Sequence, residues 1–222
     1  MMAVRASCPY EGDLSLKQII EIEKPKVHAG KAYLVIKRLF DIFFALLCLV
    51  ILLLPMLVIA VAVMIDSPGS PIFRQERLGK NGKPFLILKF RSMRKDAEAN
   101  GPQWAEENDP RCTRMGRFLR KSKLDELPQL INILMGDMSF VGPRPERAYF
   151  YEKFEQYIPG FSYRMMVTPG LTGHAQVNGG YGLPPEEKIL YDVEYIENQS
   201  IKMDIRCLVK TVWVVLTGRD AR

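Results

Sequence analysis

The adjacent carboxylates Asp125 and Glu126 are the side chains of this 222-residue chain best placed to do chemistry. Pro128 follows them, and because proline lacks an N–H it fits the first turn of the helix that the next apolar residues predict. Asp125 would then lie at or near the N-cap of that helix, where free backbone N–H groups favour negative charge. Four cations lie just before the pair: Arg117, Arg120, Lys121 and Lys123. A capping aspartate with a first-turn glutamate is the simpler interpretation, whereas the cations favour a site for phosphate chemistry.

Arg144 stands between Pro143 and Pro145, with Arg147 a short step further on. Flanking prolines restrict the backbone and lower the entropy lost when a side chain is positioned. The planar fork of an arginine side chain suits a phosphate group. Arg144 and Arg147 are therefore candidate phosphate ligands, and a structural ion pair is the alternative for Arg144.

Lys89 and Arg91 are separated by Phe90 near the end of a predicted hairpin, so they share one face of its second strand. Anionic lipid head groups, nucleotide phosphates or plain solvation would all fit this pair of cations.

The composition limits the kinds of site that the chain can build. A net charge of +6 fits an anionic partner. The four cysteines include no C-x-x-C pair and only two histidines are present, which favours neither a zinc site nor a histidine-ligated metal. Any metal would be a hard cation on oxygen ligands, and Mg²⁺ with phosphate fits best. Neither the P-loop nor the Rossmann glycine pattern occurs.

One segment predicts contact with a membrane. Residues 42–65 carry no charge and are long enough to span a hydrocarbon core as a helix. Cations flank both ends in similar numbers, so the positive-inside rule assigns no orientation. Pro55 lies in the middle of the run, where it would bend the axis. A helix that crosses once and a helix that bends and returns to the same face are both open, and Asp41 is expected to stay wet at the interface.

The remaining pattern predicts a mostly helical α+β chain. Residues 1–36 form an N-terminal arm, 37–66 a membrane helix and 67–222 a cytosolic domain. In that domain we expect a hairpin over 72–93 with an Asn-Gly turn, a polar loop over 95–112, and turns at 169–173 and 178–180. Amphipathic or capped helices are predicted over 113–121, 127–135, 184–198 and 203–217. The last could lie in a membrane interface or pack on the core.

Taken in order, several stretches resemble the bacterial sugar transferases, the monotopic polyprenyl-phosphate phosphoglycosyl transferases. They are KRLFDIFFALL, PIFRQERLGKNGKPFLILKFRSM, GRFLRKSKLDELPQLINILMGDMSFVGPRPE, VTPGLTGHAQVNG and YDVEYIENQSIKMDI, and they cover residues 37 to about 206. Their joint occurrence is far more specific than any one motif. The chain has Leu54 before Pro55, where many relatives have serine, so the depth and angle of the membrane break are open.

The resemblance implies transfer of a sugar 1-phosphate from a UDP-sugar to undecaprenyl phosphate, with release of UMP, as the first step of a surface polysaccharide or glycoconjugate. It implies a re-entrant helix broken at Pro55 in the bacterial inner membrane, with the domain on the cytosolic face. Asp125 would be the nucleophile and a Mg²⁺ ligand, with Glu126 as its partner in acid–base chemistry or metal positioning. Arg120 and Arg144 would hold phosphates, and Lys89 and Arg91 match the family's K-F-R segment.

Two functions of other classes compete with this one. A non-catalytic, membrane-anchored scaffold with a basic face would tolerate loss of Asp125 and Glu126. A nucleic-acid binder is disfavoured, because the aromatic residues are not interleaved with basic ones as a stacking platform. Residue patterns do not identify the UDP-sugar or the pathway, and homo-oligomerisation stays open.

Overall fold

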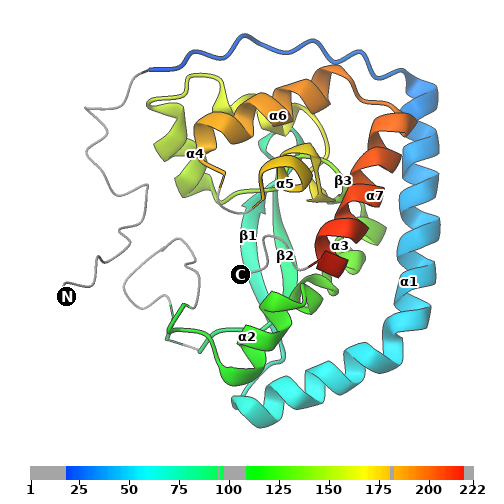
Figure 1. The fold of residues 1–222 in the computed structure, drawn as a ribbon, viewed down its shortest axis with the longest axis vertical. Helices are drawn as coiled ribbons and strands as arrows, with labels where there is room; N and C mark the ends of the chain where they lie inside the picture. Colours follow the sequence, from blue (N-terminus) through cyan, green and yellow to red (C-terminus); the bar gives the residue numbers. More distant parts are fainter. Residues whose placement is uncertain (1–18, 95, 98–108, 181–182, 218–222) are drawn as a thin grey trace.

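The computed structural model describes residues 19–94, 96–97, 109–180 and 183–217. Within them the chain is mostly helical, with two small two-stranded sheets, as the α+β prediction expects. The polar loop predicted over 95–112 and the N-terminal arm over 1–36 lie partly outside the described residues. Figure 1 shows the long helix α1 along one side of the molecule and the other elements gathered beside it.

Helix α1 runs from Lys31 to Asp66 without interruption and contains Pro55. It starts six residues before the predicted boundary at 37. Figure 1 shows a sharp turn of its axis toward the lower end, as expected when a proline removes a helix hydrogen bond. It is the one helix in the described residues that is long and apolar enough to cross a membrane, and only 11% of its most apolar window is buried. Most of its apolar surface therefore lacks protein cover.

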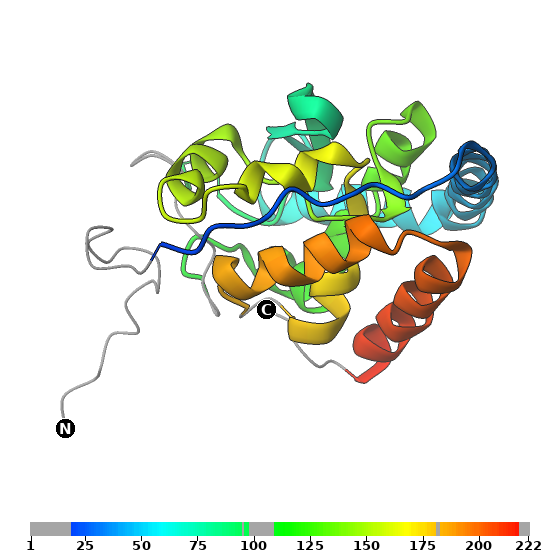
Figure 2. The same ribbon diagram turned by 90° about the horizontal axis from the view of Figure 1, so that it is seen from above.

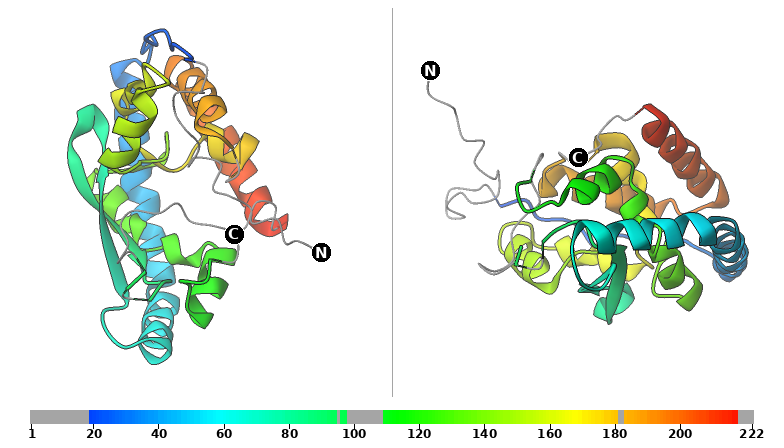
Figure 3. Two further views of the ribbon diagram at one scale, coloured as in Figure 1. Left: turned by 90° about the vertical axis from the view of Figure 1, so that its left-hand side faces the viewer. Right: turned by 90° about the horizontal axis from the view of Figure 1, so that it is seen from below.

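The predicted hairpin is confirmed. Strand β1 (Ile72–Leu78) pairs antiparallel with β2 (Pro84–Phe90), and the short 3-10 turn Lys80–Gly82 joins them. Asn81 and Gly82 both have positive φ, which explains the Asn-Gly sequence at this point. The hairpin forms one edge of the molecule in the left-hand view of Figure 3.

Helices α2 (Arg114–Lys121) and α3 (Gln129–Met135) are both found where they were predicted. The Thr113 side chain caps α2 by accepting a hydrogen bond from Gly116, and Gly136 ends α3 with φ 95°. The predicted N-cap position of Asp125 is wrong. Pro128 occupies the N-cap of α3, and Asp125 lies before it in a separate 3-10 turn, η3 (Leu124–Glu126).

A second sheet was not predicted. Strand β3 (Ser139–Val141) pairs parallel with β4 (Gly170–Thr172), which lies where a turn was expected. Helix α5 (His174–Gly179) likewise replaces most of the turn predicted around residues 178–180. These strands are only three residues long, too short for alternation of apolar and polar residues to reveal them.

The other end of the domain is a second layer of helices. It contains α4 (Ala148–Glu155), the 3-10 segment η4 (Phe161–Met166) and α6 (Pro185–Glu197). Helix α6 confirms the helix predicted over 184–198. Aromatic residues form its core. The described part of the N-terminal arm crosses this layer as an extended segment, the blue trace in Figure 2. It buries Ile22 in that core.

Helix α7 (Ile201–Thr217) lies beside the first turns of α1 in Figures 1 and 2. Asp204 of α7 accepts hydrogen bonds from Tyr33 (2.9 Å) and Lys37 (2.8 Å) of α1. Cys207 of α7 is fully buried in the core, whereas Val209, Val212 and Trp213 are exposed. The helix thus packs on the domain by one face and keeps an uncovered apolar face.

Asp41 near the start of α1 is not wet, contrary to expectation. Asp41 is buried and accepts hydrogen bonds from the Ser139 hydroxyl (3.1 Å) and the Phe140 N–H (3.0 Å). Arg38 donates to the carbonyls of Ile133 (2.6 Å) and Leu134 (2.8 Å) at the C-terminus of α3. These groups tie α1 directly to the segment that follows Asp125 and Glu126.

Candidate active site

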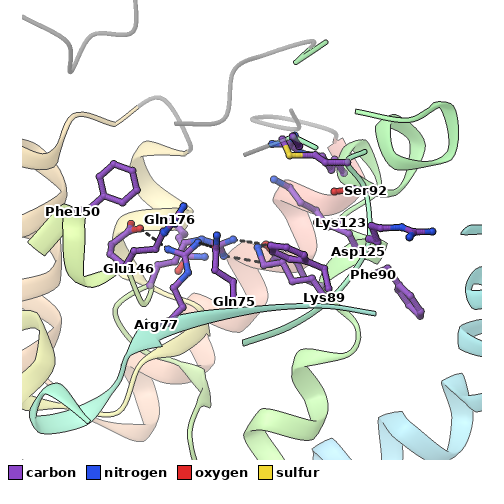
Figure 4. A pocket seen from close by; sticks show the side chains of 18 of the residues that line it. Gln75, Arg77, Lys89, Phe90, Ser92, Lys123, Asp125, Glu146, Phe150 and Gln176 are labelled. Carbon is purple, nitrogen blue, oxygen red and sulfur yellow. Dashed lines mark hydrogen bonds and ion pairs between the residues drawn. The ribbon is translucent and has the colours of Figure 1, made fainter. Parts of the chain in front are cut away.

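A cavity of about 560 Å³ lies between the hairpin, the α2–η3 segment and the layer formed by α4, α5 and α6. Eleven basic and three acidic residues line it within the described chain. The three acids are Asp125, Glu126 and Glu146. Figure 4 shows Asp125, Lys123 and Lys89 at one end of the cavity and Glu146, Phe150 and Gln176 at the other. Such an excess of inward-facing cations suits a polyanionic ligand.

Asp125 is presented by the turn η3, which begins after Lys123 in the left-handed conformation (φ 60°). Its carboxylate is 7% exposed and lines the cavity. Within the described residues no direct hydrogen bond or ion pair holds that carboxylate. Burial, followed by the negative charge of Glu126, raises the pKa of Asp125 to about 6. The carboxylate is therefore unusually basic and still mostly ionised at neutral pH.

Glu126 is in the opposite situation. It forms ion pairs with Arg144 and with the ammonium group of Lys89, whose Nζ lies 3.3 Å from Oε1. Burial opposes its ionisation, but the charges of Arg144 and Lys89 prevail and hold the pKa of Glu126 well below its ordinary value. Neighbouring carboxylates whose pKa values are driven apart in this way usually have different roles.

Two lysines close this end of the cavity. Burial lowers the pKa of Lys123 to about 8 and also lowers the pKa of Lys89. Lys123 was noted only as part of the cationic segment before Asp125, yet its side chain lies in the cavity. Both ammonium groups would be stabilised by an anionic ligand, since it would offset the cost of burying them.

The predicted phosphate-binding residues divide into two groups. Lys89, Arg120, Arg144 and Arg147 line the cavity, and Arg120 also donates to the Cys112 sulfur at 2.9 Å. Arg91 lines the cavity too, but its guanidinium donates to the carbonyls of Ser67 and Pro68 just after α1. Arg91 therefore links the end of α1 to the cavity wall. Arg117 and Lys121, which the sequence placed before Asp125, are not among the residues that line it.

The far end of the cavity was missed by sequence reasoning. Glu146 is buried there between Arg77, whose Nη1 lies 3.2 Å from its carboxylate, and Lys188 at 3.5 Å. Burial opposes ionisation of Glu146, but the charges of Lys188 and Arg77 lower its pKa. Buried Arg164 donates from Nε to Asp192 (2.6 Å) and from Nη2 to the Arg144 carbonyl (2.9 Å). The ion pair with Asp192 thus supports the loop that carries Arg144.

The residues present fit a Mg²⁺ ion only if a ligand completes its coordination. The described residues contain no cluster of three or more metal-ligating side chains. Glu126 is occupied by Arg144 and Lys89, whereas the Asp125 carboxylate is available in the cavity. Magnesium is commonly bound by one or two carboxylates together with substrate phosphates and water. Asp125 is the residue that would hold it.

With this geometry established, the family of the chain can be assigned. The family model for bacterial sugar transferases matches residues 32–218. The chain belongs to the bacterial sugar transferase family. The resemblance seen in the sequence is therefore confirmed, and the match includes all of α1 except Lys31 and every residue of the cavity named above.

Three relatives illustrate the similarity of this sugar transferase to known sequences. It is 43% identical over 214 residues to the UDP-N-acetylgalactosamine-undecaprenyl-phosphate N-acetylgalactosaminephosphotransferase of Aeromonas hydrophila, covering 95% of this chain and 51% of that protein. It is 44% identical over 191 residues to the UDP-glucose:undecaprenyl-phosphate glucose-1-phosphate transferase of Escherichia coli (strain K12), covering 84% and 41%. The exopolysaccharide production protein PSS of Rhizobium leguminosarum bv. phaseoli is 42% identical over 193 residues, covering 83% and 96%.

This sugar transferase thus spans about half or less of the first two relatives and nearly all of the third. The first two are named for different sugars, N-acetylgalactosamine and glucose, so the comparison leaves the sugar of this chain unassigned.

Proposed function

We propose that this sugar transferase moves a sugar 1-phosphate from a UDP-sugar to undecaprenyl phosphate and releases UMP. The names of its relatives support both substrates. The cavity supports a diphosphate ligand, because its lining is strongly cationic and surrounds a buried carboxylate. The product would begin a surface polysaccharide or glycoconjugate.

The observation that carries this proposal is the environment of Asp125. Its carboxylate lies in the cavity with a raised pKa, while the adjacent Glu126 is committed to cations. In the proposed first step an Asp125 oxygen attacks the phosphorus that bears the sugar. The bond from that phosphorus to the bridging oxygen breaks, and UMP leaves with the electron pair. In the second step an oxygen of undecaprenyl phosphate attacks the same phosphorus and regenerates the Asp125 carboxylate.

The neighbouring side chains have separate tasks in this mechanism. Lys89, Lys123, Arg120 and Arg144 offset the repulsion between the carboxylate and the phosphates and stabilise charge in the transition state. The lowered pKa of Glu126 supports a positioning role and argues against proton transfer. When bound, Mg²⁺ would add positive charge beside the phosphates.

The packing of α1 supports a re-entrant arrangement at the cytosolic face of the bacterial inner membrane. Ala45 near the start of α1 packs with residues of α3, and Ile59 and Val63 beyond Pro55 pack with Phe90 and Leu119. One domain thus contacts the helix on both sides of the bend. A straight crossing would carry one of these surfaces across the bilayer, away from the domain that it contacts.

A single-turnover experiment tests the proposed mechanism. Purified protein is mixed with Mg²⁺ and a panel of UDP-sugars without polyprenyl phosphate. The covalent route predicts at most about one UMP per protein and an added hexose phosphate in the intact mass. Asp125→Asn should abolish both signals and lower turnover with acceptor by roughly a thousand-fold or more.

Asp137→Asn is the matched control, because Asp137 follows α3 and does not line the cavity. It should keep both signals. UMP release that depends on the acceptor, with no adduct in wild type, would favour direct transfer and reduce Asp125 to a metal ligand. If no UDP-sugar of the panel yields UMP with or without acceptor, the transferase proposal fails and the scaffold interpretation gains.

A further inference from the structure

We infer that the outward face of α2 is a docking site for an anionic phospholipid of the surrounding membrane, separate from the cavity that holds Asp125. Three cations of this face, Arg114, Arg117 and Lys121, would bind the phosphate of the head group. A hollow between α2 and α1 would take the apolar part of the lipid beside it. Because this lipid is not consumed, the inference goes beyond the proposed transfer reaction and does not depend on it.

The cationic stretch before the carboxylate pair faces two ways in the structure. Arg120 and Lys123 line the cavity, whereas Arg114, Arg117 and Lys121 do not. The latter three are exposed and follow the spacing i, i+3, i+7, so they form one basic stripe along α2. Among the described residues, no ion pair holds any of the three. The basic stripe is therefore open to an anionic ligand.

Tight packing on the inner side of α2 fixes the basic stripe outward. A Cβ at Gly116 would lie 1.9 Å from the Ser92 carbonyl oxygen, so only glycine allows this close approach. The Thr113 N–H donates to the same oxygen at 3.1 Å, and Leu119 is fully buried on this side. Ser92 also lines the cavity. Helix α2 thus stands between the cavity and the basic stripe.

The outward face of α2 continues into the uncovered apolar side of α1. Ala62 and Ile65 of α1 line a shallow hollow together with Met115 and Phe118 of α2. Ile65 is 80% exposed and Phe118 is 57% exposed, so the hollow offers apolar surface to an outside partner. Figure 1 shows α2 beside the part of α1 that lies beyond the bend. Apolar surface next to a basic stripe matches the arrangement of acyl chain and phosphate in a phospholipid.

Asp66 marks the level of the lipid phosphates. It ends α1 and directly follows the charge-free run of residues 42–65, which belongs in hydrocarbon. Its carboxylate also lines the hollow and accepts a hydrogen bond from the Met115 N–H at 3.0 Å, which ties the start of α2 to this level. The basic stripe therefore lies near the head groups whether α1 crosses the bilayer or returns to the same face. Three cations beside one acid leave the site with net positive charge.

This charge selects an anionic lipid over a zwitterionic one. The ammonium group of a zwitterionic head group would offset the attraction of its phosphate to the basic stripe, whereas phosphatidylglycerol keeps a full negative charge. Each lysine or arginine close to an anionic lipid surface strengthens binding by about five-fold. The two arginines can in addition hold a phosphate through paired donors.

Lipid titrations of the full chain test this site without relying on turnover. Protein in a neutral detergent is titrated with phosphatidylglycerol or phosphatidylcholine, and native mass spectrometry measures the affinity of the first bound lipid. Wild type should bind phosphatidylglycerol at least about ten-fold more tightly than phosphatidylcholine. The double variant Arg117→Gln/Lys121→Gln should lose at least about ten-fold in affinity for phosphatidylglycerol and keep its affinity for phosphatidylcholine. Phe118→Ala should weaken both lipids by a similar factor, because it removes apolar contact and no charge.

Lys80→Gln/Lys83→Gln is the matched control. It removes the same charge from exposed positions at the hairpin turn, and neither lysine lines the cavity or the hollow. Both lipid affinities should match those of wild type. An equal loss in this control would show a general effect of charge and overturn the docking site. Equal affinity of wild type for the two lipids would overturn it as well.

A soluble competitor distinguishes a lipid from a free phosphate compound. Glycerophosphoglycerol is the head group of phosphatidylglycerol without its acyl chains, so at millimolar concentration it should not displace the lipid. Displacement that depends on Arg117 and Lys121 would assign the basic stripe to a soluble ligand and overturn the inference. The thermal midpoint of the double variant should match that of wild type, because both side chains are exposed. A lowered midpoint with unchanged lipid affinities would give the basic stripe a structural role instead.

Discussion

At the scale of single residues, Arg144 combines two tasks that the sequence presented as alternatives. The sequence left open whether it binds phosphate or forms a structural ion pair. In the structure it pairs with Glu126 and also lines the cavity. An arginine held by a carboxylate beside a substrate site is oriented before the substrate arrives, which lowers the entropy lost on binding.

Arg144→Lys tests the importance of the planar fork. Lysine keeps the positive charge but cannot pair with Glu126 and a phosphate oxygen through a rigid two-donor geometry. We expect turnover to fall roughly ten-fold or more, equivalent to at least about 1.4 kcal/mol of transition-state stabilisation. Steady-state UMP release measures the change. A variant that folds normally and keeps its rate would leave Arg144 with the ion pair alone.

Glu146 gives a prediction about stability and pH. Its pKa is lowered in the folded state, so it stabilises the fold above its ordinary pKa of 4.5, and this contribution is lost as the pH falls further. Glu146→Gln removes the ionisable group, so the stability difference from wild type should be largest at neutral pH and shrink below pH 4.5. Urea unfolding in detergent at neutral and acidic pH measures this difference. A constant difference across the range would contradict the assignment.

At the scale of elements, the start of α1 anchors the segment that carries the candidate site residues Asp125 and Glu126. Arg38 caps the C-terminus of α3, and Asp41 binds the start of β3. Helix α3 follows η3 closely, so α1 and the two carboxylates belong to one connected unit. Movement of α1 relative to α3 would therefore disturb Glu126 and its ion pairs.

Arg38→Met tests this anchor. It removes two hydrogen bonds to carbonyls at the end of α3 and leaves an unbranched apolar side chain in place of the arginine. We expect a loss of about 1–3 kcal/mol of stability, because those carbonyls lose charged donors in a partly buried site. The thermal midpoint in detergent measures it. Lys31→Met, at the exposed first residue of α1, is the control and should change the midpoint little.

At the scale of the whole molecule, α1 and the domain are packed together. Helix α1 buries Ala45, Ile59 and Val63 against the domain, while many of its other apolar side chains stay exposed. The uncovered apolar faces of α1 and α7 suit a protein that lies on a membrane with the cavity of the proposed transferase close to the lipid. This arrangement would bring the head group of a lipid acceptor to Asp125 without a long search.

Single-cysteine labelling tests the topology. Lys31→Cys and Lys80→Cys are made separately in a background without native cysteines; both positions are exposed and lie on opposite sides of the apolar run. A re-entrant helix places both on the cytosolic face. Neither should react with an impermeant maleimide on intact cells, and both should react after permeabilisation. Reaction of only one site on intact cells would show that the helix crosses the membrane.

The sequence alone determined the features that depend on local chemistry. Helix α3 follows from the spacing of its apolar residues and from Gly136, which ends it. Helix α6 follows from the two prolines at its start. The hairpin follows from Asn81-Gly82 between two apolar runs. Arg120 was identified from the cationic stretch before the carboxylate pair, Arg144 and Arg147 from the prolines around Arg144, and Lys89 and Arg91 from their shared strand face. All five line the cavity. Membership of the family was likewise readable from consecutive motifs.

Tertiary structure alone decided which charges meet. Glu146, Lys188 and Arg77 are far apart in the chain, and no local pattern links them, yet they share one ion-pair cluster at the far end of the cavity. Asp41 reads as a wet interfacial charge because its partners on β3 are almost a hundred residues away. The contrast between a basic Asp125 and an acidic Glu126 has the same origin: the pKa of a carboxyl group depends on burial and on neighbouring charges, which only the folded chain brings together.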